Sequence, residues 1–273
     1  MKVLNGSDLA DFIKERQAKQ VRSLRQSQNI FPKLAIIVNG DNPVNEVYLR
    51  LKKQYGEDIL VDVEIYQVSD EELMNQINTL NKDEGVHGII VQLPISNPSM
   101  TNEVINAISA EKDVDGLGEN SKFIAATPTA IDWLLAGYNI DLNYKKIAIV
   151  GEGRLVGAPL AKLWRNNGLQ VEVYDDTTTE LGEKLREAEI IVSATGVPSL
   201  IKSDMLSHGV VVVDAGTASE DGVVVGDVDS EVRNRDDLTI TPIKGGVGTL
   251  TVAALFDNVI TATRQSADKN KII

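Results

Sequence analysis

The sequence contains no cysteine and only two histidines among its 273 residues. Without cysteine the chain has no disulfide framework, no thiolate nucleophile and no cysteine-based metal site. The two histidines, His87 and His208, stand too far apart in the sequence to form a local metal-binding motif. We therefore expect no metal cofactor.

Basic charge and long hydrophobic runs are also scarce. The 27 Lys and Arg residues oppose 40 Asp and Glu residues, so the formal net charge is -13 at pH 7. This balance argues against a broad nucleic-acid surface or an anionic membrane as partner. No apolar run approaches the length of a membrane span, and the first residues lack a secretory hydrophobic region. We expect a cytoplasmic protein without a nucleic-acid or membrane partner.

What the chain does contain is a hydrophobic share of 42%, which is enough for a sizeable core. Short apolar runs alternate with segments whose apolar residues recur at helical spacing, an order that favours parallel βαβ units. The expected strands are 34–38, 59–68, 86–95, 147–150, 171–174, 190–194 and 210–214, with short extended pieces at 223–228 and 238–242. The expected helices are 8–27, 44–55, 70–81, 101–109, 127–137, 178–188 and 250–264, with another directly after the glycines at 151–157.

We predict an α/β fold of two domains. A polar turn at 111–116 marks the end of the first domain, which we place at 1–119, so that the second spans 120–273. Ser69 and Glu72 resemble a capping box, and Thr127 with Pro128 resembles a helix start with Thr127 as the cap.

One stretch combines a buried strand with a glycine turn. The apolar run 147–150 leads into Gly151-x-Gly153-x-x-x-Gly157 and then into a helical pattern. Such glycines let the backbone turn tightly and approach a pyrophosphate, which the amino end of the following helix attracts. The spacing is one residue longer than the common dinucleotide fingerprint, so a purely structural strand-to-helix turn is the alternative.

Two acidic residues follow the next strand, about twenty residues after the glycines. A carboxylate at this position bonds the ribose hydroxyls of NAD and repels the additional phosphate of NADP. Asp175 and Asp176 stand there, and Glu152 inside the turn adds negative charge. Together with the glycines, they predict a dinucleotide site that favours NAD over NADP.

Four polar residues lie where a second ligand would bind. Tyr48 and Lys52 are four residues apart and share a helix face, although such a pair is also common on solvated helices. Gln92 interrupts the end of an apolar strand, either to orient a neighbouring ammonium or as a satisfied core amide. Asp115 either caps a turn or bonds a ring amide of a heterocycle.

In these residues the chain resembles the bifunctional methylenetetrahydrofolate dehydrogenase and methenyltetrahydrofolate cyclohydrolase family. The resemblance covers nearly the whole chain, and its motifs come in the family's order. They are Gly40-Asp41-Asn42-Pro43 leading to Tyr48-Leu49-Arg50-Leu51-Lys52, Val91-Gln92-Leu93-Pro94, Lys112-Asp113-Val114-Asp115-Gly116 with Asn120, Thr127-Pro128, Val225-Gly226-Asp227-Val228-Asp229, and Thr241-Pro242 with Gly245-Gly246-Val247-Gly248.

The resemblance implies an amino-terminal α/β folate-binding domain, a Rossmann-like NAD(P)-binding domain, an active-site cleft between them and a homodimer. It implies that the helix at about 250–265 packs back on the first domain. It also implies two reactions: hydride passes from methylenetetrahydrofolate to NAD or NADP, and water then converts the methenyl product to formyltetrahydrofolate.

The site residues follow from the same resemblance. Lys52 handles protons, Gln92 orients Lys52, Tyr48 packs against the folate and Asp115 bonds the pterin. The folate contacts implied are Tyr48, Gln92, Leu93, Pro94, Asp115, Gly245, Gly246 and Gly248. The nucleotide contacts implied are Gly151, Glu152, Gly153, Arg154, Val156, Gly157, Asp175, Asp176, Thr195 and Gly196.

The chain departs from the family pattern around the nucleotide. Glu152-Gly153 replaces the usual Arg-Ser, and Asp175-Asp176 replaces the usual His-Ser. Both replacements remove groups that suit NADP. Two alternatives stay open at this point: a monofunctional cyclohydrolase with impaired nucleotide use, and a non-catalytic NAD- or folate-binding regulator.

Overall fold

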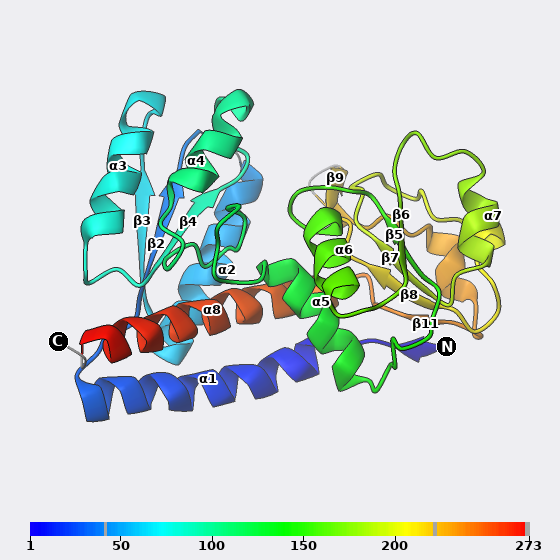
Figure 1. The fold of residues 1–273 in the computed structure, drawn as a ribbon. Helices are drawn as coiled ribbons and strands as arrows, with labels where there is room; N and C mark the ends of the chain where they lie inside the picture. The colour runs from blue at the N-terminus through cyan, green and yellow to red at the C-terminus, as the bar shows by residue number, and fades with distance from the viewer. Residues whose placement is uncertain (41–42, 221–222, 271–273) are drawn as a thin grey trace. The chain divides into compact units, whose positions relative to one another are not determined.

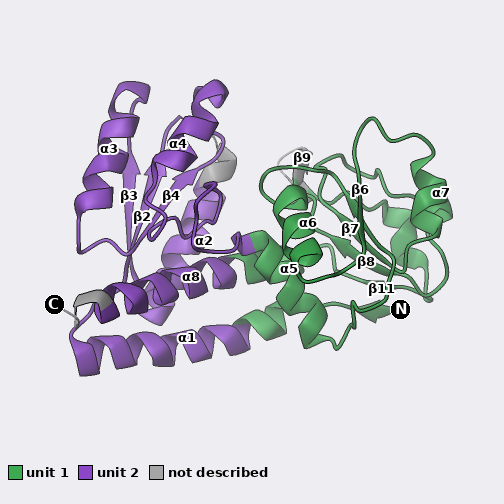
Figure 2. Ribbon diagram, in the orientation of Figure 1, with its two compact units in different colours: residues 1–10, 127–251 green, residues 11–126, 252–273 purple. Residues whose placement is uncertain are grey.

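The computed structural model of the protein describes residues 1–40, 43–220 and 223–270. It divides into two compact units (Figure 2). The three-stranded unit comprises residues 11–126 and 252–273, and the six-stranded unit comprises residues 1–10 and 127–251. The single boundary at residue 119 stays a prediction. The first ten residues belong to the six-stranded unit, which is otherwise formed by the later part of the chain. The last 22 residues belong to the three-stranded unit, which is otherwise formed by the earlier part.

The three-stranded unit is built on a parallel sheet of order β3-β2-β4 (Figure 1). Its strands are β2 (Lys33–Val38), β3 (Asp62–Gln67) and β4 (Gly88–Gln92), and its helices are α2 (Pro43–Ile59), α3 (Asp70–Lys82), the short η1 (Pro98–Met100) and α4 (Thr101–Ala107). The helices α1 (Gly6–Gln28) and α8 (Val247–Asn270) each belong partly to this unit.

Apolar side chains on one face of this sheet form a buried core. Ala35 and Ile37 of β2 pack with Leu73 and Ile77 of α3 and with Val104 of α4. The strand β2 is buried along nearly its whole length, as expected for a parallel strand covered on both faces.

The capping box at the start of α3 is confirmed. The backbone N–H of Ser69 donates to Glu72 Oε2 at 3.1 Å, and the Ser69 hydroxyl donates to the same oxygen at 2.9 Å.

The six-stranded unit has a parallel sheet of order β1-β11-β8-β7-β5-β6. Its strands are β1 (Lys2–Val3), β5 (Ile147–Val150), β6 (Val171–Tyr174), β7 (Ile190–Ser193), β8 (Val211–Asp214) and β11 (Thr239–Ile240), and a separate antiparallel pair is formed by β9 (Ala218–Glu220) and β10 (Val223–Val225). Its helical segments are α5 (Ala126–Gly137), α6 (Gly157–Asn166), α7 (Leu181–Arg186), η2 (Ser203–Met205) and η3 (Ser230–Asn234).

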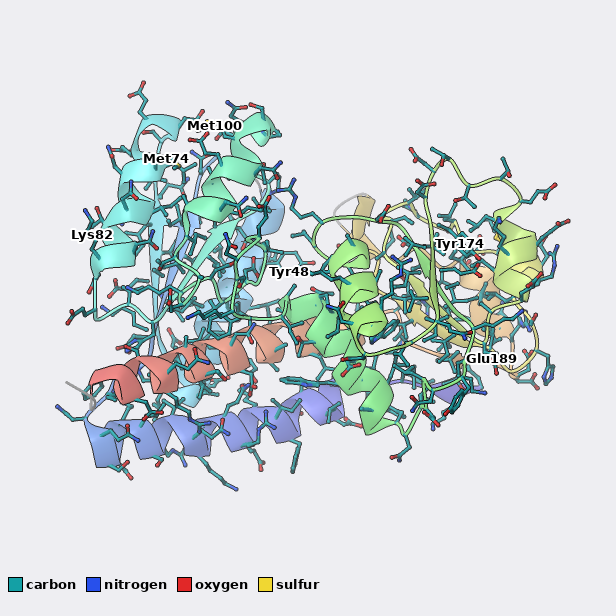
Figure 3. The ribbon with its side chains drawn as sticks, viewed as in Figure 1. Tyr48, Met74, Lys82, Met100, Tyr174 and Glu189 are labelled. Carbon is teal, nitrogen blue, oxygen red and sulfur yellow. The ribbon has the colours of Figure 1, made fainter. Side chains whose placement is uncertain are left out.

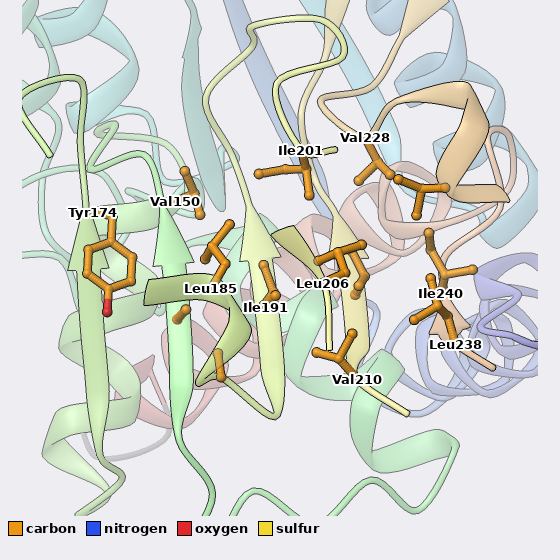
Figure 4. Close-up of a cluster of buried hydrophobic side chains, with 14 residues drawn as sticks. Val150, Tyr174, Leu185, Ile191, Ile201, Leu206, Val210, Val228, Leu238 and Ile240 are labelled. Atoms are coloured by element: carbon orange, nitrogen blue, oxygen red, sulfur yellow. The ribbon is translucent and has the colours of Figure 1, made fainter. Parts of the chain in front are cut away.

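Buried side chains of neighbouring strands meet under α7 and η3 in this unit (Figure 4). Val150, Tyr174 and Ile191 come from β5, β6 and β7, and they share a cluster with Leu185 of α7 and Val232 of η3. The predicted α/β class with parallel sheets in both parts of the chain is therefore confirmed.

Several predicted helix ends were wrong; α2, for example, continues to Ile59 instead of ending at residue 55. The helix α5 begins at Ala126, so Thr127 lies inside its first turn and is not its cap. Pro128 is tolerated there because the first N–H groups of a helix have no partner within the helix. The Thr127 hydroxyl instead accepts a hydrogen bond from Thr251 at 3.4 Å.

The helix predicted at 178–188 is shorter, since α7 spans only Leu181–Arg186. The Asp175 side chain accepts hydrogen bonds from the backbone and hydroxyl of Thr177, which folds the preceding residues into a turn. The last helix is longer than predicted and begins at Val247, so Gly248 lies in its first turn. Asp41 and Asn42, part of the first family motif, lie outside the described residues.

Candidate active site

Lys52 and Gln92 meet at the carboxyl end of β4. Lys52 lies on α2, and its Nζ donates a hydrogen bond to Gln92 Oε1 at 2.8 Å. Gln92 is the last residue of β4, and its Nε2 donates to the carbonyl of Leu93 at 3.3 Å. This second bond fixes the amide so that its oxygen, not its nitrogen, faces the lysine. Gln92 thus accepts a hydrogen bond from the lysine and donates one to the backbone; that it orients Lys52 for catalysis stays a prediction.

The surroundings of Lys52 disfavour its charged form. Burial lowers the pKa of Lys52, and the negative charge of Asp115 acts in the opposite direction. A lysine whose pKa is lowered by desolvation can take up and return a proton, which an ordinary surface lysine does poorly near neutral pH. Lys52 has the setting of a general base.

Asp115 reaches the same end of the sheet through a segment that runs beside β4. Residues Ile89 and Asp113 form a parallel bridge, so the chain from Asp113 to Asp115 advances in the same direction as the end of β4. Burial raises the pKa of Asp115, while the charge of Lys52 lowers it. A carboxyl group next to a shuttling lysine can accept or donate a hydrogen bond to a ligand.

The turn that holds Asp115 is fixed on both sides. Asp113 accepts hydrogen bonds from the N–H groups of Gly116 at 3.2 Å and Gly118 at 2.8 Å. Gly116 has φ of 71°, and a Cβ there would lie 2.6 Å from the backbone nitrogen of Ala125, so only glycine fits. The position of Asp115 is therefore set by backbone geometry.

Tyr48 lies one helical turn before Lys52 on α2 and is partly buried (Figure 3). Tyr48 and Lys52 therefore lie on the same helix, as predicted, and Lys52 points at Gln92. After Gln92 the chain leaves β4 through Leu93 and Pro94, which are joined by a cis peptide bond. Leu93 is partly buried and Pro94 exposed.

The glycine turn of the six-stranded unit joins β5 to α6 as predicted. Gly151 has φ of 96°, and a Cβ there would lie 2.6 Å from the carbonyl oxygen of Ala194. A Cβ on Gly157, the first residue of α6, would lie 1.8 Å from the carbonyl oxygen of Gly151. Gly153 is different, since a Cβ there would meet nothing within 4 Å. Two of the glycines are required by packing, and the third leaves open space above the turn.

The charged residues of this region are exposed. Glu152 and Arg154 lie in the turn, and Asp175 and Asp176 follow the end of β6. Hydrogen bonds from Thr177 lower the pKa of Asp175, which is therefore an anion that already belongs to a turn.

Three further predicted segments lie in the loops of this unit. Thr195 and Gly196 follow β7, and Gly196 has φ of 69°. Val156 precedes α6 and is partly buried. Gly245 has φ of 80°, and Gly246 is buried, with Thr249 donating its hydroxyl to the Gly246 carbonyl at 2.9 Å. These residues all lie in the six-stranded unit.

The sequence interpretation assigned no role to a pair of buried carboxylates in the same unit. Asp227 is fully buried, and Asp214 is largely so. The signal was present as Val225-Gly226-Asp227, a motif quoted without a chemical reason. Among the described residues no group of three or more His, Asp or Glu side chains is arranged to hold a metal ion. No described helix is long and apolar enough to cross a membrane.

Comparisons with known proteins cover both units. Residues 4–115 match the family description tetrahydrofolate dehydrogenase/cyclohydrolase, catalytic domain, and residues 125–267 match its NAD(P)-binding domain. The bifunctional protein FolD of Aquifex aeolicus is 40% identical over 274 residues, with 94% of each chain covered. That of Hydrogenobaculum sp. is 39% identical, covering 97% of this chain and 99% of the relative.

Solved structures agree. The crystal structure of the FolD methylenetetrahydrofolate dehydrogenase/cyclohydrolase from Campylobacter jejuni superposes with a TM-score of 0.91 at 36% identity, covering 97% of this chain and 99% of that one. The Trypanosoma brucei enzyme, solved with NADP and an inhibitor, gives 0.90 at 28% identity, with 97% of each chain covered. The chain belongs to the tetrahydrofolate dehydrogenase/cyclohydrolase family.

Proposed function

We propose that this protein oxidises methylenetetrahydrofolate with a nicotinamide nucleotide and hydrolyses the methenyl product to formyltetrahydrofolate. The observation that carries the proposal is the hydrogen bond of 2.8 Å between a lysine of lowered pKa, Lys52, and Gln92. The similar proteins from Campylobacter jejuni and Aquifex aeolicus, both described as bifunctional, support it.

In the hydrolytic reaction Lys52 moves protons. With one N–H held by Gln92, the neutral amine presents its lone pair to a water molecule and takes a proton as the water oxygen adds to the methenyl carbon. The resulting ammonium returns that proton to the folate ring nitrogen as the carbon–nitrogen bond breaks. The hydroxyl proton of the addition intermediate is released to solvent as its oxygen becomes the formyl carbonyl, so the reaction yields one proton overall. Lysine suits this role because burial lowers its pKa.

Asp115 and Tyr48 bind the folate in this proposal. The Asp115 carboxyl bonds the amide edge of the pterin, a group that offers both donors and an acceptor. Tyr48 presents a ring for stacking one turn before Lys52. Leu93, Pro94 and the glycines at 245, 246 and 248 complete the folate contacts.

The six-stranded unit fits a dinucleotide. The turn is too tight for a side chain at Gly151 or Gly157, and Gly153 leaves open space next to the amino end of α6. A nicotinamide bound there would supply the hydride acceptor, and these residues would supply the positioning. We assign the pyrophosphate to residues 151–157, which include Arg154 and Val156. We assign the ribose to Asp175 and Asp176. Thr195 and Gly196, at the end of the next strand, complete the nucleotide contacts.

We propose NAD rather than NADP as the preferred nucleotide. Asp175, Asp176 and Glu152 are exposed carboxylates around the place where a 2′-phosphate would bind, and charges of the same sign repel. Arg154 is the exposed cation of the same turn.

Steady-state assays with each nucleotide test both parts of the proposal. We expect dehydrogenase activity with a higher kcat/KM for NAD than for NADP, and hydrolysis of methenyltetrahydrofolate without any nucleotide. A preference for NADP would contradict the assignment and indicate that Arg154 holds the phosphate. Hydrolysis without any dehydrogenase activity would identify a monofunctional cyclohydrolase, and absence of both activities with retained binding would identify a regulator.

The homodimer and the cytoplasmic location stay predictions. Light scattering of the purified protein tests the first, because a dimer has twice the 29.7 kDa mass of the chain.

A further inference from the structure

Asp227 is a fully buried carboxylate that binds the carboxyl end of strand β7 in the six-stranded unit. Its Oδ2 accepts a hydrogen bond from the Ser193 hydroxyl at 2.7 Å and from the backbone N–H of Thr195 at 2.7 Å. The side chain is 0% exposed. Its other oxygen, Oδ1, is buried and has no hydrogen-bond partner among the residues that the structure describes.

A second carboxylate holds Asp227 in place. Asp214, at the end of β8, accepts from the backbone N–H of Asp227 at 3.0 Å and from that of Val228 at 3.2 Å. Arg233 donates to the same side chain at 3.2 Å. Burial raises the pKa of Asp214, and the nearby Asp227 charge adds to the effect.

Two glycines leave room for this pair. A Cβ on Gly216 would lie 1.9 Å from Asp227 Oδ1, and one on Gly226 would lie 2.1 Å from Asp214 Oδ2. Burying two neighbouring carboxylates is costly, and apolar residues of similar volume would serve packing alone as well or better. The arrangement therefore calls for a role beyond packing.

The hydrogen bond to Thr195 leads to the glycine turn. Thr195 follows β7, whose neighbour in the sheet is β5, the strand that Gly151 directly follows. A Cβ on Gly151 would lie 2.6 Å from the Ala194 oxygen and 3.1 Å from Thr195 Cγ2, so the turn packs directly against this segment. Fixing the N–H of Thr195 fixes one wall of the turn.

We propose that Asp227 is a positioning residue for the dinucleotide, which holds the Thr195 segment against the Gly151 turn in the shape that binds NAD. The inference rests on the proposed function of the six-stranded unit. Because Asp227 is fully buried, it would act on NAD only through the N–H of Thr195 and not by direct contact.

The test compares four full-length proteins. Asp227→Ala removes the acceptor, whereas Asp227→Asn keeps an oxygen that can accept both hydrogen bonds. Ser193→Ala removes the other donor to the same carboxylate but leaves the Thr195 bond in place. For each protein we would measure the Kd for NAD by calorimetry, the KM for NAD, the thermal midpoint, and methenyltetrahydrofolate hydrolysis without nucleotide.

We expect Asp227→Ala to raise the Kd and KM for NAD about tenfold or more, as befits a buried N–H left without an acceptor. Hydrolysis should stay within about twofold of the parent, since Lys52 and Gln92 lie in the three-stranded unit. Asp227→Asn should restore most of the NAD affinity, and Ser193→Ala should lower the thermal midpoint with little change in Kd. If Asp227→Ala does not fold, Asp227→Ser replaces it, because its hydroxyl is too short to reach Thr195.

Unchanged NAD affinity in Asp227→Ala would overturn the inference, as would an equal loss in Ser193→Ala or a proportional loss of both activities. A parent protein that does not bind NAD or NADP would instead refute the proposed function, which separates the two failures.

Discussion

At the scale of single residues, the hydrogen bond between Lys52 and Gln92 distinguishes this lysine from its neighbours on α2. Lys53, the next residue, is exposed, whereas Lys52 is partly buried and directed at the end of β4. Burial lowers the pKa of Lys52, so a proton can leave it nearer to neutral pH than from an ordinary lysine. The chemistry assigned to the pair can be tested by removing the amine.

Replacing Lys52 by Met should remove the proton shuttle and keep the length of the side chain. Because general acid–base groups contribute factors of about a hundred to ten thousand, we expect hydrolysis of methenyltetrahydrofolate to fall by at least about a hundredfold. NAD binding should be unchanged. Lys53→Met is the matched control and should hydrolyse at the parent rate; normal hydrolysis in Lys52→Met would remove Lys52 from the mechanism.

Asp115 should set the pH at which Lys52 works. The Asp115 charge raises the pKa of Lys52 against the lowering effect of burial. In Asp115→Asn that charge is gone, so the pKa of Lys52 falls further and the amine becomes neutral at lower pH. The rising limb of the hydrolysis rate, measured as kcat/KM against pH, should move to lower pH even if its height decreases. A limb that stays in place or moves to higher pH would contradict the coupling.

Residue types and spacing singled out Tyr48, Lys52 and Gln92 as a polar pair on one helix face and a glutamine at a strand end. Their roles came only from the resemblance to the family, because such a pair is also common on solvated helices. Asp227 could not be singled out, because its importance depends on Ser193 and Thr195, more than thirty residues away, and on burial. Thr127 shows the opposite error: its side chain is a good cap by type, but the helix begins one residue earlier.

At the scale of elements, the β5–α6 turn depends on two glycines that pack against backbone. Replacing Gly157 by Ala would place a methyl group 1.8 Å from the Gly151 carbonyl oxygen, so the turn must open. We expect a loss of about 1–3 kcal/mol in the free energy of unfolding, typical of overpacking, and weaker NAD binding. Urea unfolding and calorimetry measure the two effects.

A glycine of another helix provides the comparison. In Gly182→Ala, on α7, the new methyl group would meet the flexible side chains of Met205 at 3.2 Å and Arg186 at 3.7 Å, and no backbone atom is among these nearest contacts. Stability and NAD binding should stay near those of the parent. Equal behaviour of the two variants would show that the tight contact at Gly157 is not what shapes the turn.

Strands that are continuous apolar runs were predicted well, whereas elements whose bounds depend on tertiary contacts were not. The strands β2, β5 and β7 are buried runs, which the sequence displays directly. The two-residue strand β1 has no such pattern; it exists because Lys2 and Val3 pair with β11 at the sheet edge. The α7 helix begins late because Asp175 bonds Thr177.

At the scale of the whole molecule, each end of the chain belongs to the unit that is formed mainly by the other half of the sequence. Residues 1–10 group with the six-stranded unit and residues 252–273 with the three-stranded unit. Within the latter, Gln17 of α1 donates to the Ala253 carbonyl of α8 at 2.8 Å, a pair 236 residues apart in sequence. A helical period indicates which face of α1 is buried but not which partner covers it, so the sequence alone suggested one boundary.

The net charge of -13 acts on the whole molecule and opposes its compact state. The ion pairs that offset it, such as Lys122–Glu111 and Lys146–Glu187, are largely exposed and contribute little. Repulsion should therefore outweigh these pairs at low ionic strength. Raising NaCl from about 10 mM to about 100 mM shortens the screening length from about 30 Å to about 10 Å.

We expect this change of salt to raise the thermal midpoint at pH 7 by a few degrees, because it screens repulsion between acidic residues more than it weakens exposed ion pairs. Differential scanning calorimetry at several salt concentrations measures the effect. Choline chloride should act as NaCl does, since screening depends on ionic strength rather than on the cation, and a response to sodium alone would indicate a bound ion. A midpoint that falls with salt would show that ion pairs dominate, and it would contradict the view that acidic repulsion is the main electrostatic force on this fold.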